Sequence, residues 1–133
     1  LKEMIEGAGH WLSPNMKNYV GRVEELPFDQ HFLKALVAPR VLLTTEALGD
    51  LYANPTGTWL THEATREVYQ YLGVENKIGI HYRAGEHNHI LADWLVFLDF
   101  AQWQFRGINP SNSFDQCPFK ELPKAYSWSQ PKS

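Results

Sequence analysis

The chain lacks the features that mark several classes of protein. Cys117 is its only cysteine, so no disulfide can close within the 133 residues. No stretch approaches the roughly 20 consecutive apolar residues that a membrane-spanning helix needs. The chain has 12 lysine and arginine residues against 15 aspartate and glutamate residues, and no run of like charge exceeds two residues. We therefore expect neither a nucleic-acid partner nor a membrane partner.

The composition is that of a globular domain rich in large rings. Hydrophobic residues make up 44% of the chain and aromatic residues 14%, and the length allows one domain with a modest core. Apolar spacing and capping residues predict alternating helices and strands. The expected elements are a helix over 27–37 capped by Asp29, a strand over 40–45, a helix from Thr61 to Leu72, a strand over 77–83, and a helix over 90–106 that ends at Gly107.

The order of these elements predicts the fold class. Strands that alternate with helices form a parallel sheet with helices on both faces, which is an α/β arrangement. Two strands alone make an incomplete sheet, so we expect them to need neighbours. Residues 1–18 are predicted to be an irregular connection. We expect residues 1–107 to belong to one domain and residues 108–133, which hold four prolines, to form a C-terminal tail.

Two loops carry the candidate catalytic residues. Asp50 follows the first predicted strand and His87 follows the second. The carboxyl ends of parallel strands meet at one edge of a sheet, so these two side chains should lie close together. A carboxylate in that place can hold an imidazole in one tautomer and stabilise the imidazolium that forms when it takes a proton from a serine.

Other interpretations compete with this one. Asp50 stands beside a glycine and ahead of Asn-Pro, a setting typical of a turn. His89 is a second candidate base, and the group formed by His81, Glu86, His87 and His89 has the ligand types of a zinc site. However, His81 lies in the middle of a strand and no further ligand is spaced to close the site. We therefore expect no metal.

An ordered series of motifs resembles one enzyme family. The motifs are Leu26-Pro-Phe-Asp-Gln-His31, Ala35-Leu-Val-Ala-Pro-Arg40, Asp50-Leu-Tyr-Ala-Asn-Pro55, Gly85-Glu-His87, Asp93-Trp94 and Leu98-Asp-Phe-Ala101. The series extends from about His10 to Gly107 and is similar to the C-terminal half of bacterial glucuronoyl esterases, which are carbohydrate esterases of the α/β-hydrolase fold. The resemblance implies the C-terminal part of a three-layer α/β-hydrolase sandwich.

The resemblance also implies a reaction. Such enzymes cleave the ester that joins 4-O-methyl-glucuronate on xylan to lignin alcohols, by a Ser-His-acid mechanism without a cofactor. His87 matches the family's histidine, and Asp50 matches an acid found in many bacterial members. Tyr52 stands where the family has a tryptophan that packs on the uronate ring. The implied partner is glucuronoxylan or a lignin–carbohydrate ester, and the implied location is secreted or periplasmic.

One part of such a site is not found in the sequence. There is no Gly-x-Ser-x-Gly nucleophile elbow, and the serines fall in predicted loops or in the tail. We therefore expect the nucleophile and the N-terminal half of the domain to lie upstream, and these 133 residues alone to be inactive. In many members a glutamate near the nucleophile is the main acid, which leaves the role of Asp50 open. The alternatives are an acetyl-xylan or other carbohydrate esterase, or a non-catalytic carbohydrate-binding fragment using Trp11, Tyr52 and Trp59.

Overall fold

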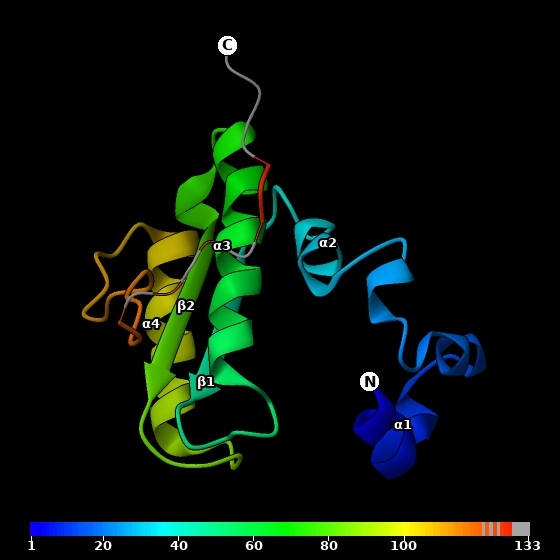
Figure 1. Cartoon of the computed structure of the whole chain (residues 1–133). Helices are drawn as coiled ribbons and strands as arrows, with labels where there is room; N and C mark the ends of the chain where they lie inside the picture. Colours follow the sequence, from blue (N-terminus) through cyan, green and yellow to red (C-terminus); the bar gives the residue numbers. More distant parts are fainter. Residues whose placement is uncertain (121, 123, 125, 129–133) are drawn as a thin grey trace.

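Two parallel strands between two long helices form the centre of the computed structural model, which describes residues 1–120, 122, 124 and 126–128 (Figure 1). Short 3-10 turns connect several of the elements. The elements are α1 (Lys2–Ala8), η1 (Gly9–Trp11), η2 (Pro14–Tyr19), η3 (Val23–Glu25), α2 (Gln30–Ala35), β1 (Leu42–Ala47), α3 (Pro55–Tyr71), η4 (Glu75–Lys77), β2 (Ile78–Arg83) and α4 (Leu91–Arg106).

The sheet pairs β1 with β2 in parallel, in register from Leu42 opposite Ile78 to Ala47 opposite Arg83. It has two strands within the part of the chain that the structure describes. Both strands point the same way, so the loops that follow them lie together at one end of the molecule (Figure 1). The predicted alternation of helices with parallel strands is confirmed.

Each face of the sheet is covered by one long helix, because side chains alternate along a strand. On the first face, the Tyr82 hydroxyl donates to the carbonyl of Pro55 at 2.8 Å, which joins β2 to α3. On the other face, Gly79 lies against Phe100 of α4. A Cβ at position 79 would come 2.8 Å from the Phe100 ring, so glycine is what lets α4 approach the strand.

The segment after α4 adds to this second layer. Phe114 is buried with Val96 and Phe100, and its carbonyl accepts a hydrogen bond of 2.8 Å from the Ile80 amide on β2. The Asp99 carboxylate accepts hydrogen bonds from Ser111 and from Asn112, which fix the start of the segment to α4. The domain boundary at residue 107 stays a prediction.

Several predicted helix boundaries differ from the structure. Helix α3 begins at Pro55 rather than after Thr61, so the prediction of Thr61 as the cap is wrong. Asn54 is the cap instead, with its Oδ1 accepting from the Gly57 amide at 3.1 Å, and a proline at the first helical position needs no hydrogen-bond partner for its nitrogen. The Asp29 cap of α2 is confirmed. Residues 2–8 form α1 where an irregular connection was expected.

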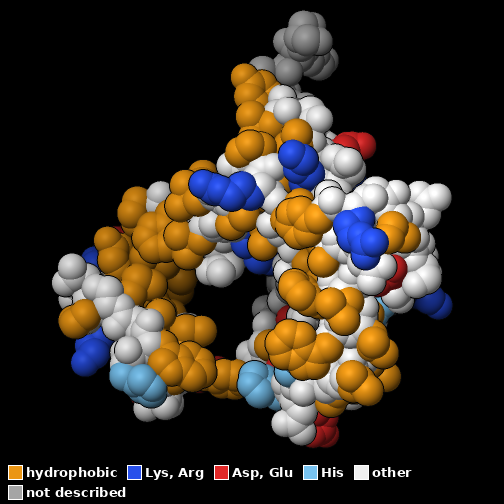
Figure 2. Space-filling model, turned by 180° about the vertical axis from the view of Figure 1, so that it is seen from behind, with side chains coloured by type: hydrophobic (Ala, Val, Ile, Leu, Met, Phe, Trp, Pro, Cys, Tyr) orange, Lys and Arg blue, Asp and Glu red, His pale blue; other side chains and the backbone are white. Residues whose placement is uncertain are grey.

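Helix α4 buries a different face from the one that its sequence emphasises. Asp93, Val96 and Phe100 are its buried residues, whereas Trp94 and Leu95 are more than half exposed. On the face seen from behind, exposed hydrophobic side chains (orange) lie on both sides of a central opening (Figure 2). The exposed large hydrophobic residues of α2, α4 and the loop after β1 are Phe32, Leu33, Leu48, Leu51, Tyr52, Leu91, Trp94, Leu95, Phe97, Leu98 and Phe105.

Candidate active site

The structure brings together the acid and the histidine that the sequence singles out. The His87 Nδ1 lies 2.6 Å from the Asp50 Oδ2, although 37 positions separate the two residues. The Asp50 side chain is only 10% exposed, whereas the imidazole is 85% exposed. An exposed ring held at one nitrogen by a sheltered carboxylate leaves its other nitrogen free to react.

Backbone hydrogen bonds join the two loops and place this pair. The Leu48 amide donates to the Arg83 carbonyl at 2.9 Å, and the Gly49 amide donates to the Gly85 carbonyl at 2.8 Å. These bonds continue the pairing of β1 with β2 beyond the strands. A Cβ at Gly49 would fall 2.5 Å from the Gly85 carbonyl oxygen, so the close approach of the loops requires glycine at position 49.

The hydrogen bond within the pair determines which nitrogen of the neutral His87 ring carries the hydrogen. The hydrogen bond from His87 lowers the pKa of Asp50 below its ordinary value, more strongly than partial burial raises it, and a bond from the Ala53 amide adds to the lowering. Asp50 is therefore a carboxylate at neutral pH and can only accept. It follows that Nδ1 of the neutral imidazole carries the hydrogen and that Nε2 presents a lone pair.

The pair borders a cavity of about 220 Å³. His89 also lines this cavity, but its Nδ1 is 3.9 Å from Asp93 on α4 and its ring meets Trp94 edge-on. The structure thus places His87, and not its competitor His89, against Asp50. The residues that line the cavity are Thr45, Glu46, Ala47, Asp50, Ala53, Arg83, His87, His89 and Asp93.

The three aromatic residues that are candidates for sugar binding lie in different settings. Tyr52 is on the Asp50 loop and is 66% exposed, with no ring contact to any residue that the structure describes. Trp11 is also exposed, but it belongs to η1 near the start of the chain. Trp59 is buried in α3 against His62, so the expectation that it is exposed for sugar binding is wrong.

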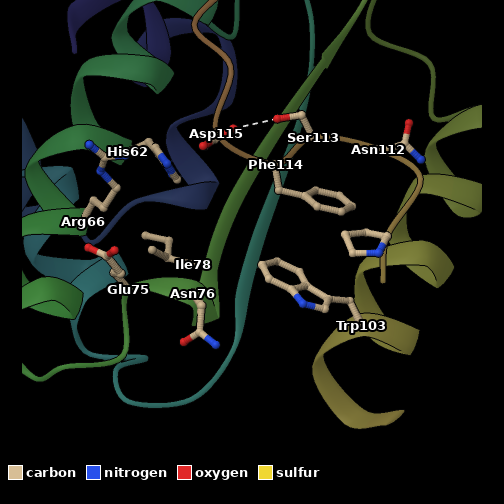
Figure 3. A pocket seen from close by; sticks show the side chains of 11 residues that line it. His62, Arg66, Glu75, Asn76, Ile78, Trp103, Asn112, Ser113, Phe114 and Asp115 are labelled. Atoms are coloured by element: carbon tan, nitrogen blue, oxygen red, sulfur yellow. Dashed lines mark hydrogen bonds between the residues drawn. The ribbon is translucent and has the colours of Figure 1, made fainter. Parts of the chain in front are cut away.

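A larger cavity, of about 300 Å³, lies elsewhere, at the amino end of β2 (Figure 3). His62 and Arg66 line it from α3, and Trp103 and Phe114 line it from the opposite side. His62 is 1% exposed, and its Nδ1 has no partner among the described residues. Burial lowers the pKa of His62 to about 3, so it stays neutral at physiological pH. None of the predicted site residues borders this cavity, and the Nδ1 of its histidine is hydrogen-bonded to no described carboxylate.

Metal ligands do not gather in the described part of the chain. No three histidine, cysteine, aspartate or glutamate side chains lie together there as a metal site requires. Glu46, a further candidate acid, accepts from its neighbour Ala47 and from Thr58 on α3. The side chains of Ser111 and Ser113 are bound to aspartates and do not contact His87. No helix of the described residues is long and apolar enough to cross a membrane.

Two residues that sequence reasoning missed are Arg83 and Asp93. Their side chains meet at 2.8 Å directly behind the His87 loop. The signal that points to Arg83 is a charged residue at the end of a largely buried strand. Asp93 belongs to the Asp93-Trp94 motif, which by itself assigns it no role.

Comparison with known proteins gives consistent matches. A family profile described as glucuronyl esterase, fungi, matches residues 1–73, a range that includes Asp50 and Tyr52 and ends before His87. Carbohydrate esterase MZ0003, from an unknown prokaryotic organism, is 34% identical over 74% of this chain and 26% of its own length. The 4-O-methyl-glucuronoyl methylesterase 1 of Phanerochaete chrysosporium is 38% identical over 59% of this chain and 16% of its own length.

A solved structure agrees with the sequence matches. The carbohydrate esterase family 15 glucuronoyl esterase from Caldicellulosiruptor kristjansonii superposes with a TM-score of 0.77 and 43% sequence identity, over 80% of this chain and 28% of that one. The chain thus spans about a quarter of the length of MZ0003 and of the Caldicellulosiruptor kristjansonii enzyme. The predicted fold, part of an α/β-hydrolase sandwich, is confirmed by this similarity.

Proposed function

Because the chain belongs to the glucuronoyl esterase family, we propose that it supplies the base and an acid of a serine esterase acting on 4-O-methyl-glucuronate esters. The observation that carries the proposal is the 2.6 Å contact between His87 and Asp50 at the carboxyl ends of paired parallel strands. The nucleophilic serine comes from outside these residues, since no serine in the described part of the chain contacts His87.

The roles follow from the geometry of the pair. The His87 Nε2 takes the proton from the serine as its oxygen attacks the ester carbonyl, and later returns that proton to the departing alcohol. Asp50 holds the hydrogen on Nδ1 and stabilises the imidazolium between the two steps. Water then releases the uronic acid by the same proton transfers in reverse order.

Tyr52 is the proposed contact to the uronate ring. It is exposed on the loop that carries Asp50, and an aromatic face can pack on the apolar face of a pyranose. In this proposal the substrate is a glucuronoxylan or lignin–carbohydrate ester. A substrate of that size is met outside the cytoplasm, so the proposal includes secretion or export to the periplasm. Residues 1–107 form part of the hydrolase domain and residues 108–133 its tail.

Substitutions of the pair in the full-length protein test this function. His87→Ala should lower kcat by about 10⁴-fold on a methyl ester of 4-O-methyl-glucuronate, because the base is lost. Asp50→Asn should lower kcat by about 10³-fold, because an amide cannot hold the same tautomer. Glu86→Gln is the matched control: it is an exposed acid beside His87 with no role in proton transfer, and it should leave kcat unchanged.

The outcomes separate the proposal from its alternatives. Full activity of the His87→Ala variant would contradict the role of this chain in catalysis. A loss below about 10-fold in Asp50→Asn would make Asp50 an auxiliary acid, with the main acid outside these residues. Turnover of acetylated xylan in preference to the uronate ester would favour another carbohydrate esterase. The purified 133 residues should show no esterase activity.

A further inference from the structure

Arg83, the last residue of β2, directs its side chain to the loop that carries His87. The side chain is 15% exposed, and Nη1 donates to the Ala84 carbonyl at 3.0 Å. Nη2 donates to the carbonyl of Glu86 at 3.2 Å and also to the carbonyl of Asn88. Those two residues flank His87. One guanidinium nitrogen therefore holds the backbone on both sides of the histidine.

Asp93 fixes the guanidinium in turn. The Arg83 Nε donates to Asp93 Oδ1 at 2.8 Å, while Oδ2 accepts from the Ile90 amide at the start of α4, also at 2.8 Å. Burial raises the pKa of Asp93, but the hydrogen bonds from Arg83 and Ile90 outweigh it and lower the pKa below its ordinary value. The Asp93 carboxylate is 5% exposed and charged, so it anchors both the arginine and the end of the loop.

The loop fits closely around this arginine. Gly85 has φ +105°, a conformation that side chains rarely adopt, and a Cβ there would lie 2.8 Å from the Arg83 Nη1. The Gly85 carbonyl also receives the amide of Gly49, next to Asp50. The position of the guanidinium is thus linked through Gly85 to both halves of the His87–Asp50 pair.

The exposure of the histidine makes this support necessary. In the described part of the chain, Asp50 is the one side chain that is hydrogen-bonded to the His87 ring, and 85% of the imidazole is open to solvent. No ring among the described residues packs on the imidazole, so its position depends on the backbone from Glu86 to Asn88. A lysine could not replace Arg83, because a compact ammonium cannot reach a carboxylate and three separate carbonyls at once.

We infer that Arg83 is a positioning residue for the esterase site, whose guanidinium holds the His87 backbone so that Nδ1 meets Asp50 and Nε2 faces the substrate. This inference rests on the proposed function of the pair, but its central claim concerns the tautomer of His87. That claim can be measured without any substrate.

The test uses Arg83→Lys in the full-length protein, with histidine labelled with nitrogen-15. Long-range proton–nitrogen NMR should show the Nδ1–H tautomer of His87 in the wild type and a shift toward Nε2–H in the variant. On the uronate methyl ester, kcat should fall by about 10- to 100-fold, while KM stays within about twofold. Arg106→Lys, at the exposed end of α4, is the matched control and should change neither tautomer nor kcat.

The results distinguish positioning from general stabilisation. A folded Arg83→Lys variant with the wild-type tautomer and kcat would overturn the inference. If Arg83→Lys does not fold, Asp93→Asn carries the same test, because it keeps the shape of the side chain and removes the charge that fixes the guanidinium. A wild-type tautomer in Asp93→Asn would overturn the inference as well. If the wild-type protein cleaves no uronate ester, the proposed function fails, and the tautomer still reports on Arg83.

Discussion

His87 and His62 are two histidines of the same small fold with opposite settings. His87 is 85% exposed, stands in a loop after β2 and meets a carboxylate. His62 is 1% exposed, stands within α3 and lies tilted against the Trp59 ring, with no partner for its Nδ1 among the described residues. The ring of His87 is hydrogen-bonded to a carboxylate and open to solvent, whereas that of His62 is closed to solvent and has one nitrogen without a partner.

The difference shows why the larger cavity is the poorer candidate site. Burial, together with the positive charges of Lys34 and Arg66, outweighs the opposing effect of Asp115 and keeps His62 neutral over the physiological pH range. In the smaller cavity, Asp50 fixes one nitrogen of the His87 ring and leaves the other open, which is the arrangement that the proposed function requires. Whether a histidine here is a candidate catalytic base therefore depends on a carboxylate partner and on the loop geometry, and not on the volume of the cavity.

Away from the His87–Asp50 pair itself, the largest effect should come from pushing apart the two loops that carry the pair. Gly49→Ala places a Cβ about 2.5 Å from the Gly85 carbonyl oxygen, where backbone must move. We expect kcat/KM on the uronate ester to fall by about 100-fold in the full-length protein, because a shift of about 1 Å misplaces the pair. Gly7→Ala, with nothing within 4 Å of its Cβ, is the control. Activity within twofold of the wild type in Gly49→Ala would contradict this account.

The next effect concerns His62 and acid. Its folded pKa of about 3 lies below the ordinary 6.5, with Lys34 and Arg66 opposing its protonation and Asp115 favouring it. The unfolded chain therefore binds the proton more readily, and stability present above pH 6.5 is lost as the pH falls toward 3. Urea unfolding should show a loss of about 2 kcal/mol from this group between about pH 6.5 and pH 5.

A variant assigns that loss to His62. In His62→Gln the pH dependence over the same interval should shrink by about 2 kcal/mol, and esterase activity at neutral pH should stay near the wild-type value. An unchanged pH dependence would show that His62 is protonated as easily in the folded chain as in the unfolded one.

The sequence was enough to predict that Asp50 and His87 lie together, because its signals are local. Asp50 and His87 each follow a short apolar run, and parallel pairing of those runs brings the two loops to one edge. The same local logic located α4 and the Asp29 cap. It failed at Asn54-Pro55, where residues typical of a turn instead begin a helix that continues for 17 residues.

What could not be predicted depends on contacts between distant segments. The residues near Arg83 in the sequence do not predict its contacts. Its guanidinium donates hydrogen bonds to three carbonyls of the following loop and to Asp93. Trp59 lies within α3 because this helix starts earlier than the sequence predicts, and its ring is buried against His62. The buried face of α4 likewise depends on a distant segment, since Gly79 on β2 leaves room for the Phe100 ring beside Phe114.

A smaller effect should come from filling the space at Gly79, on the sheet face that α4 covers. Gly79→Ala brings a Cβ to 2.8 Å from the Phe100 ring and 3.1 Å from the Phe114 Cβ. We expect a loss of about 1.5 kcal/mol in the free energy of unfolding, measured in urea, because the packed rings must shift. The His87 tautomer should not change, since neither loop contacts these rings. A stability equal to that of Gly7→Ala would show that the rings yield without cost.

The smallest effect should come from Tyr52, which shares its loop with Asp50 but takes no part in proton transfer. Tyr52→Ala removes an exposed ring that contacts no other ring among the described residues, so stability should not change. On the uronate ester we expect KM to rise about fivefold, or about 1 kcal/mol of lost ring contact, with kcat unchanged. Tyr52→Phe separates ring from hydroxyl: a KM near the wild-type value assigns the contact to the aromatic face. A fall in kcat in Tyr52→Ala would instead place this residue in the chemistry with His87.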